Sequence, residues 1–254
     1  MRLPRRCFAL LLALLIVCAA RPASARQTGE DFVRAAKNND LAAVRQLADQ
    51  NPALLDARDS VQMTALMWAA SEGNNDIVAF LLDRGASVNA VDRWHGTALV
   101  RAAHANNLVA ARALVAKNAD PNVRDVWGTD ALFRAAEKSD PALATLLLDH
   151  GANPNARDTR GYTALMRAVS LGNGETLRTL LDRGASVNAR DRRGVSVLMR
   201  AARAGQLAAV QLLLEREADP RARSRAGATA RTLAASGGHA DIARLLAQAE
   251  RRKR

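Results

Sequence analysis

Leucines recur along most of the chain at a fixed spacing of 33 residues. One series occupies the same position in successive blocks: Leu66, Leu99, Leu132, Leu165 and Leu198. A second series has the same spacing: Leu81, Leu114, Leu147, Leu180, Leu213 and Leu246. Aspartates follow the same period at Asp59, Asp92, Asp125, Asp158 and Asp191. Units of this size cannot bury an apolar face alone, so the period predicts short elements that stack into a solenoid.

The block Thr159–Asp191 indicates what each unit contains. Thr163 is a favourable N-cap for a first helix, and Gly172 can take the left-handed conformation that ends it. A second helix runs through Leu180 and ends before Gly184. Both helices have about two to three turns and are too short to be stable alone, so contacts between units must stabilise them. The residues between units are rich in Asn, Asp and Gly, which predicts a turn.

The block resembles the ankyrin repeat, in which a turn precedes two antiparallel helices. The family signature D-x-x-G-x-T-P-L-H-x-A-A is similar to DTRGYTALMRAV at 158–169 and to DRRGVSVLMRAA at 191–202. The family's closing G-A-x-x-N is similar to GASVN at 85–89 and 184–188 and to GANPN at 151–155. The resemblance implies an all-α solenoid of about seven helix-turn-helix repeats.

Two departures from the family pattern are systematic. Alanine replaces the usual proline at positions 65, 98, 131, 164 and 230. Methionine replaces the usual histidine at positions 67, 166 and 199. Alanine favours a helix but does not restrict the unfolded chain as proline does, so we expect some loss of stability without a change of fold.

The period divides the chain into four parts. Residues 1–25 are a leader, 26–59 a degenerate N-terminal capping repeat, 60–224 five repeats of 33 residues, and 225–254 a C-terminal capping repeat with a basic tail. The first unit contains one inserted residue and has NPALLDARD in place of the glycine loop. The last unit has Arg231 at a position of the first leucine series. Terminal repeats commonly depart from the pattern because one face has no neighbour, and Arg231 gives the last unit a polar outer face.

The leader has the pattern of a secretory signal peptide. Three arginines precede an uncharged, mostly apolar run over 7–20, and Ala-Ser-Ala at 23–25 supplies a cleavage site after Ala25. The run is too short to span a bilayer comfortably, so a signal anchor is the alternative interpretation. Both cysteines of the chain lie within the leader, so cleavage leaves a protein without thiols.

The chain is basic, with a formal net charge of +12. The leader holds four arginines and no acid, so the remainder carries +8. An alanine- and arginine-rich chain with such a leader is typical of an exported bacterial protein. We therefore expect a periplasmic protein, with secretion or signal anchoring as alternatives. In that compartment we expect an acidic protein or another anionic surface as partner rather than nucleic acid, and we interpret the Arg251–Arg254 tail as a solvated end.

The sequence contains no recognisable catalytic constellation. Its four histidines lie in different units, without a partner cysteine or H-x-x-x-H spacing: His95, His104, His150 and His239. The periodic aspartates begin loops, where such residues usually bond their own turn rather than a metal. We therefore expect no enzyme, no cofactor and no metal, and a hydrolase is the weakest alternative.

Aromatic residues provide the strongest indication of a binding site. The resemblance implies that partners are held by the turn tips and the first helices. Trp94 and Trp127 occupy the third residue of their turns and Tyr162 occupies the fifth, so neighbouring units should align the three rings in a row. Trp and Tyr are enriched in interface hot spots. The alternative is that each indole only covers the neighbouring turn.

A second series lies at one position of successive first helices: Trp68, Arg101, Arg134, Arg167 and Arg200. One interpretation is a groove that binds carboxylate-rich or otherwise anionic partners. Arg134 also has Glu137 at helical neighbour spacing, so the alternative is a ladder of ion pairs within the fold.

Together these features predict a monomeric, non-catalytic module that binds a partner protein and supports or inhibits it. The resemblance extends to exported bacterial ankyrin proteins that support or restrain a partner made nearby, such as a catalase or a secreted toxin. The alternative is a binder of anionic envelope components, lipid or cell-wall polymer. The predicted contact residues are Trp68, Trp94, Trp127, Tyr162, Arg101, Arg134, Arg167 and Arg200.

Export can be tested by measuring the intact mass of the protein in cell fractions. We expect a periplasmic species whose mass corresponds to a chain beginning at Arg26. A species of full-length mass in the membrane fraction would instead indicate a signal anchor.

Overall fold

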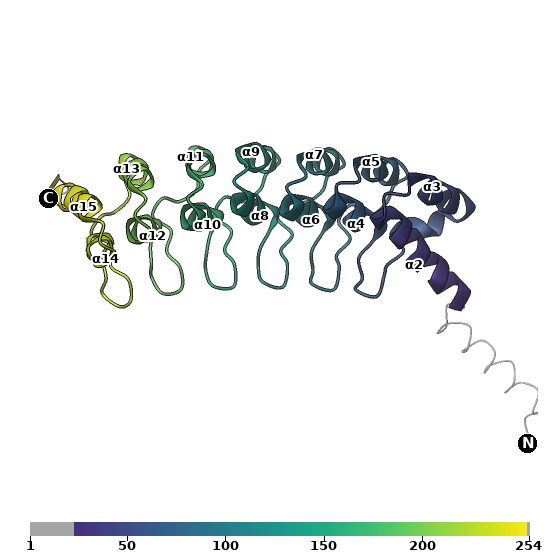
Figure 1. Ribbon diagram of the computed structural model, residues 1–254, viewed down its shortest axis with the longest axis horizontal. Coiled ribbons are helices and arrows are strands. Elements are labelled where there is room, and N and C mark those ends of the chain that lie inside the picture. The colour runs from purple at the N-terminus through teal and green to yellow at the C-terminus, as the bar shows by residue number, and fades with distance from the viewer. Residues whose placement is uncertain (1–22, 253–254) are drawn as a thin grey trace, which may run out of the picture.

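The computed structural model describes residues 23–252, which form a solenoid of seven helix pairs (Figure 1). The first helices of the pairs are α2 (Ala23–Lys37), α4 (Ala65–Glu72), α6 (Ala98–Ala105), α8 (Ala131–Lys138), α10 (Ala164–Leu171), α12 (Val197–Arg203) and α14 (Ala230–Ser236). The second helices are α3 (Leu41–Gln50), α5 (Asn75–Asp83), α7 (Leu108–Ala116), α9 (Pro141–Asp149), α11 (Gly174–Asp182), α13 (Leu207–Glu215) and α15 (Ala240–Arg252). The expected all-α solenoid is confirmed.

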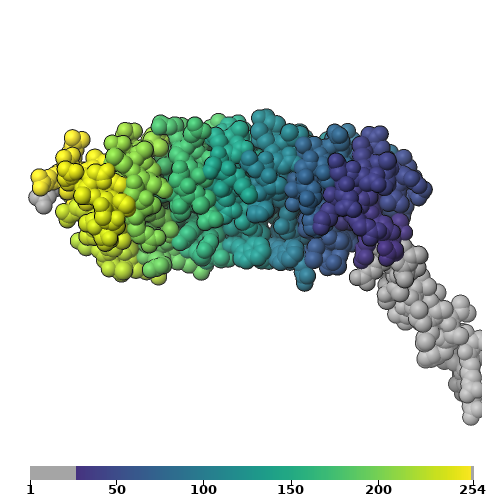
Figure 2. Space-filling model, in the orientation of Figure 1, coloured from purple at the N-terminus to yellow at the C-terminus, as the bar shows by residue number. Residues whose placement is uncertain are grey.

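The two sets of helices form two layers, and the turns project in a row beyond the first helices (Figure 1). The space-filling view shows one elongated body in which each unit lies only beside its neighbours (Figure 2). Apart from the first residues of α2, the predicted leader lies outside the described residues, as do residues 253–254 of the tail. Within residues 23–252, no helix is both long and apolar enough to cross a membrane.

The helix ends follow the predicted local signals. Thr163 caps α10, because its hydroxyl accepts a hydrogen bond from the Met166 N–H at 3.3 Å. Gly172 ends that helix with φ of 77°, and Gly184 follows α11 with φ of 85°. Both glycines are in the left-handed region, which glycine adopts at little steric cost. The capped helices are nevertheless short, so their stability comes from packing.

The core consists of the periodic apolar positions. Every leucine of both series is at most 1% exposed. Between the first helices lies a series of fully buried alanines: Ala69, Ala102, Ala135, Ala168 and Ala201. Their small side chains let adjacent first helices approach closely, while the leucines fill the space between the layers. Burying each leucine contributes roughly 1.5 to 3 kcal/mol, and the units therefore stabilise one another.

Side-chain amides also join successive units at the start of the second helices. Asn74, Asn107, Asn173 and Gln206 each donate to a backbone carbonyl in the first helix of the preceding unit, at 2.7–3.2 Å. Asp140 occupies the same position in the fourth unit and caps α9, but a carboxylate has no N–H to donate. The junction before Asp140 therefore lacks this bond.

The terminal units differ from the others as their sequences suggest. A short 3-10 helix, η1 (Pro52–Asp56), replaces the glycine loop of the first unit and buries Leu54. In the last unit Arg231 is exposed and forms an ion pair with Glu250 at 3.3 Å. The last unit therefore presents polar groups where the stack has no further neighbour.

Asp130 is an irregular member of the helix-capping series. It caps α8 by accepting the Phe133 N–H at 2.8 Å, in the position that Thr97 and Thr163 occupy in neighbouring units. Its side chain is buried, and burial raises the pKa of the carboxyl group to about 6. The folded state therefore binds this proton more tightly than the unfolded state does, because an unfolded Asp has a pKa of about 3.9.

This difference predicts that the Asp130 carboxyl group destabilises the fold as pH rises from about 4 to above 6. Asp130→Thr should remove the effect, because threonine caps the helix without ionising. We expect the variant to be more stable than the parent by about 2 to 3 kcal/mol at pH 8, with little of that gain left at pH 4. Urea denaturation of both proteins across this range measures the gain, and a gain independent of pH would contradict the assignment.

Candidate partner-binding site

The aspartate that begins each turn holds the tip in place. One carboxylate oxygen of Asp92 accepts the backbone N–H groups of Trp94 and Gly96, at 2.8 and 3.0 Å. Asp125 bonds Trp127 and Thr129 in the same way, both at 2.9 Å. The prediction that these aspartates bond their own turns is confirmed. Each indole is therefore carried by a constrained backbone.

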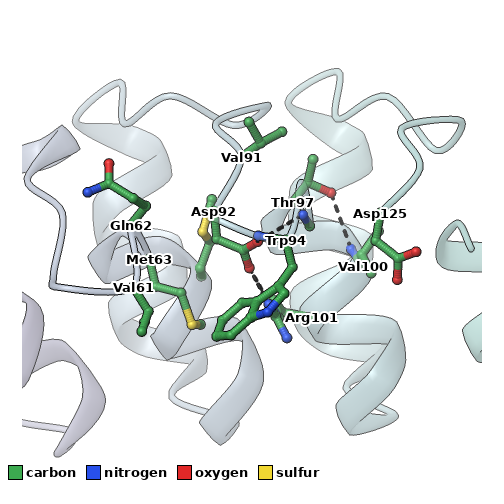
Figure 3. Close-up of polar contacts among 12 residues, drawn as sticks. Val61, Gln62, Met63, Val91, Asp92, Trp94, Thr97, Val100, Arg101 and Asp125 are labelled. Carbon is green, nitrogen blue, oxygen red and sulfur yellow. Dashed lines mark hydrogen bonds and ion pairs between the residues drawn. The ribbon is translucent and has the colours of Figure 1, made fainter. Parts of the chain in front are cut away.

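The second oxygen of these aspartates binds a side chain nine residues later, on the first helix. Arg101 pairs with Asp92, as Figure 3 shows, and Arg200 pairs with Asp191. Arg134 lies 2.9 Å from an Asp125 oxygen and 3.1 Å from Glu137.

The two remaining members of the row have related partners. Arg167 binds Glu137 at 2.8 Å, while Arg160 occupies the second oxygen of Asp158 at 3.3 Å. Trp68 donates its indole N–H to Asp59 at 2.8 Å. The whole row is thus bonded to acids of the fold itself, as in the ion-pair ladder. Its charge is largely offset before any partner arrives.

Four of the predicted contact residues line a single hollow between the third and fourth units. Its volume is about 240 Å³, and its walls include Trp94, Trp127, Arg101 and Arg134. Trp127 is 52% exposed, an unusual position for an indole. The hollow is therefore open to solvent beside a large apolar ring.

Trp94 is more covered than Trp127. The Arg101 guanidinium lies 5.6 Å from its ring centre, and in Figure 3 the indole points toward Met63 and Val61 of the preceding turn. Trp94 therefore fits the alternative interpretation, in which the indole covers the neighbouring turn. It also forms a wall of the hollow. Trp127 is the ring that remains available to a partner.

Tyr162 and Trp68 do not join this hollow. The guanidinium of Arg200 lies 4.0 Å from the centre of the Tyr162 ring, and that of Arg160 lies 5.0 Å away. The Lys37 ammonium lies 3.8 Å from the Trp68 ring centre. Cations thus lie over both rings, an arrangement that contributes about 0.5 to 2 kcal/mol each to the fold. Of the predicted row of aromatic side chains, Trp94 and Trp127 therefore line one hollow while Tyr162 is covered, and Trp68, the first member of the arginine row, is covered as well.

His104 also lines the hollow, which sequence reasoning did not predict. Burial, followed by the positive charges of Lys138 and Arg134, lowers the pKa of its imidazole. The lowered pKa favours the neutral imidazole, which adds a hydrogen-bonding group to the wall. Its position three residues after Arg101 on α6 is the sequence signal that places it on the same face.

His95 has a structural role in the same turn. Its Nδ1 lies 2.8 Å from the Arg124 carbonyl oxygen, which can only accept a hydrogen bond. In neighbouring units an arginine makes the corresponding bond, since Arg157 donates to the Arg190 carbonyl at 2.6 Å. Val91 occupies the arginine position of this unit, so His95 supplies the bond that an arginine would make.

Comparisons with known proteins give the family. A family model described as ankyrin repeats (3 copies) matches residues 32–125 and 99–191, and a second, described as ankyrin repeats (many copies), matches residues 180–234. The chain belongs to the ankyrin repeat family. Ankyrin repeats are generally non-catalytic modules for protein–protein interaction. Within the part of the chain that the structure describes, no cluster of His, Cys, Asp and Glu is suited to hold a metal ion.

A shorter segment is similar to the serine/threonine-protein kinase VIK of Arabidopsis thaliana. The two are 49% identical over 59 residues, which is 23% of this ankyrin chain. The chain spans only 14% of the length of that kinase. This similarity is therefore no basis for assigning the kinase's activity to the ankyrin chain.

The turn aspartates should contribute more to stability than surface ion pairs do. Asp191→Ala leaves the buried Arg200 charge without its partner, and we expect a loss of about 3 kcal/mol. The matched control is Asp182→Ala, which removes a half-exposed partner of Arg216 and should cost less than about 1 kcal/mol. Urea denaturation measures both, and equal losses would contradict a special role for the turn aspartate.

Proposed function

We propose that this ankyrin solenoid binds a partner protein at the hollow beside Trp127. The supporting observation is a half-exposed indole on a turn that Asp125 holds in place. Interface hot spots combine such aromatic anchors with desolvated surroundings. A preorganised backbone also lowers the entropy cost of binding. A partner side chain that enters the hollow would contact the indole, and the rim would supply Arg101 and Arg134.

The chemistry of the hollow favours an acidic partner with an apolar or aromatic anchor of its own. Arg101 and Arg134 each have a carboxylate neighbour, so they orient a partner rather than attract one over a distance. The net charge of the chain supplies that longer-range attraction. Because the arginine row is paired, anionic lipid or cell-wall polymer has less support as a ligand of this face.

We also propose that the mature protein acts in the periplasm, as a monomer that supports or inhibits its partner. The basis is the leader over residues 1–25, with its positive start, apolar run and small-residue cleavage site. Secretion or anchoring through the leader remains the alternative location.

Partner capture tests the binding site. The purified protein, immobilised and incubated with a periplasmic extract, should retain a specific partner. We expect Trp94→Ala combined with Trp127→Ala to weaken that retention at least tenfold, because the apolar surface of the hollow is lost. Circular dichroism establishes that the double variant is folded.

A matched control removes exposed apolar groups elsewhere. Val109→Ala with Leu171→Ala changes two exposed side chains away from the hollow and should leave retention within about twofold of the parent. A folded tryptophan variant that keeps every specific partner would show that the proposed site is wrong.

A further inference from the structure

The last three turns carry a dense group of exposed arginines, which we call the basic strip. Its members are Arg157, Arg160, Arg190, Arg192, Arg193, Arg223 and Arg225. They lie in the row of turns that projects below the first helices, toward the C-terminal end of the solenoid (Figure 1). We propose that the basic strip binds a flexible linear polymer that carries phosphate groups. This site is separate from the hollow beside Trp127 and does not depend on it.

The strip has a rigid backbone. The Arg192 N–H donates to the Arg160 carbonyl at 3.3 Å, and the Arg225 N–H donates to the Arg193 carbonyl at 3.0 Å. The turns are packed so closely that a Cβ atom on Gly161 would lie 3.0 Å from the backbone nitrogen of the next turn. The arginines are therefore presented at fixed spacing, and binding does not require the turns to be ordered first.

Several of these charges have no compensating acid. Arg192, Arg193 and Arg225 form no ion pair with any acid within residues 23–252. Arg190 and Arg223 donate to backbone carbonyls, at 3.4 and 3.1 Å, which orients them without cancelling their charge.

The acids among these turns are already engaged. Asp191 is buried and pairs with Arg200, and Asp158 is buried beside Arg160. A surplus of positive charge therefore remains at the turn tips.

The shape and composition of the strip favour an oxyanion polymer over other ligands. Guanidinium groups bind phosphate oxygens in pairs, with defined geometry. The residues beside the arginines at the last turn tip are small: Ser224 lies between Arg223 and Arg225, and Ala226 and Gly227 follow them. They offer neither an anchor for a protein interface nor a large apolar group to enter a membrane. Tyr162 lies under Arg200, so the strip also lacks an open ring on which nucleic acid bases could stack.

Titration with inorganic polyphosphate tests the proposal, and the protein used is the whole chain without its predicted leader, residues 26–254. We expect binding that weakens steeply with salt, because each occupied arginine releases counterions. Replacing Arg192, Arg193 and Arg225 together by glutamine should weaken binding at least tenfold. The slope of log Kd against log salt should fall by about 2 to 3. These side chains are exposed, so the variant should remain folded, which circular dichroism checks.

The control removes the same charge from the opposite layer. Arg112→Gln, Arg178→Gln and Arg244→Gln change exposed residues of the second helices, and we expect polyphosphate binding within about twofold of the parent. Equal weakening in both triple variants would show a dependence on net charge alone and would overturn the assignment to the strip.

Two further arms complete the test. Vesicles of phosphatidylglycerol and phosphatidylethanolamine provide a phosphate-bearing surface, and binding to vesicles without binding to polyphosphate would also overturn the proposal. Trp94→Ala with Trp127→Ala should bind polyphosphate as the parent does. Loss of binding in that folded variant would place the polymer at the hollow instead.

Discussion

The exposed surface depends on the hydrogen bonds and ion pairs made by the aspartate at the start of each turn. One of its oxygens accepts two backbone N–H groups of its own turn, and in most turns the other binds a side chain on the following first helix. The second oxygen of Asp158 binds Arg160 of its own turn instead. In the third unit these partners are Trp94, Gly96 and Arg101. A single carboxylate therefore couples the turn tip to the helix layer, and the buried desolvated charge is compensated from both directions. In the last turn Ser224 replaces the aspartate and accepts only the Ala228 N–H, at 3.2 Å.

The same interaction explains how a basic chain distributes its charge. Arginines of the first helices are largely neutralised by the turn aspartates. Others donate to carbonyls one unit further along, as Arg157 does to Arg190, and these keep their charge while serving the backbone. A third group has no acid partner within residues 23–252, and three of its members, Arg192, Arg193 and Arg225, lie in the turns at the C-terminal end. Net charge alone does not distinguish these classes, because each arginine counts as +1 whether or not an acid is bonded to it.

Where a residue departs from the repeat pattern, nearby residues replace the lost hydrogen bond in some units and not in others. Where Val91 replaces an arginine, His95 makes the inter-unit hydrogen bond in its place. Where Asp140 replaces an amide, the cap remains but the bond to the preceding unit is lost. Asp130 keeps the cap that threonine makes elsewhere, at the cost of burying an ionisable group. The stack tolerates such changes because each unit depends only on its immediate neighbours.

The sequence by itself determined the fold, because the 33-residue period states which positions are buried in every unit. It also determined the capping residues, the left-handed positions at Gly172 and Gly184, and the use of turn aspartates, since these are local properties. The tertiary structure decided which predicted contact residues remain available. Trp127 is exposed while Tyr162 and Trp68 lie under cations, and the arginine row is paired. The cover of Tyr162 by Arg200 and of Trp68 by Lys37 depends on packing between neighbouring units, which the spacing within one unit does not state. The pairing of the arginines depends on how each turn folds back against the helix that follows it, which the sequence pattern left open between a groove and a ladder.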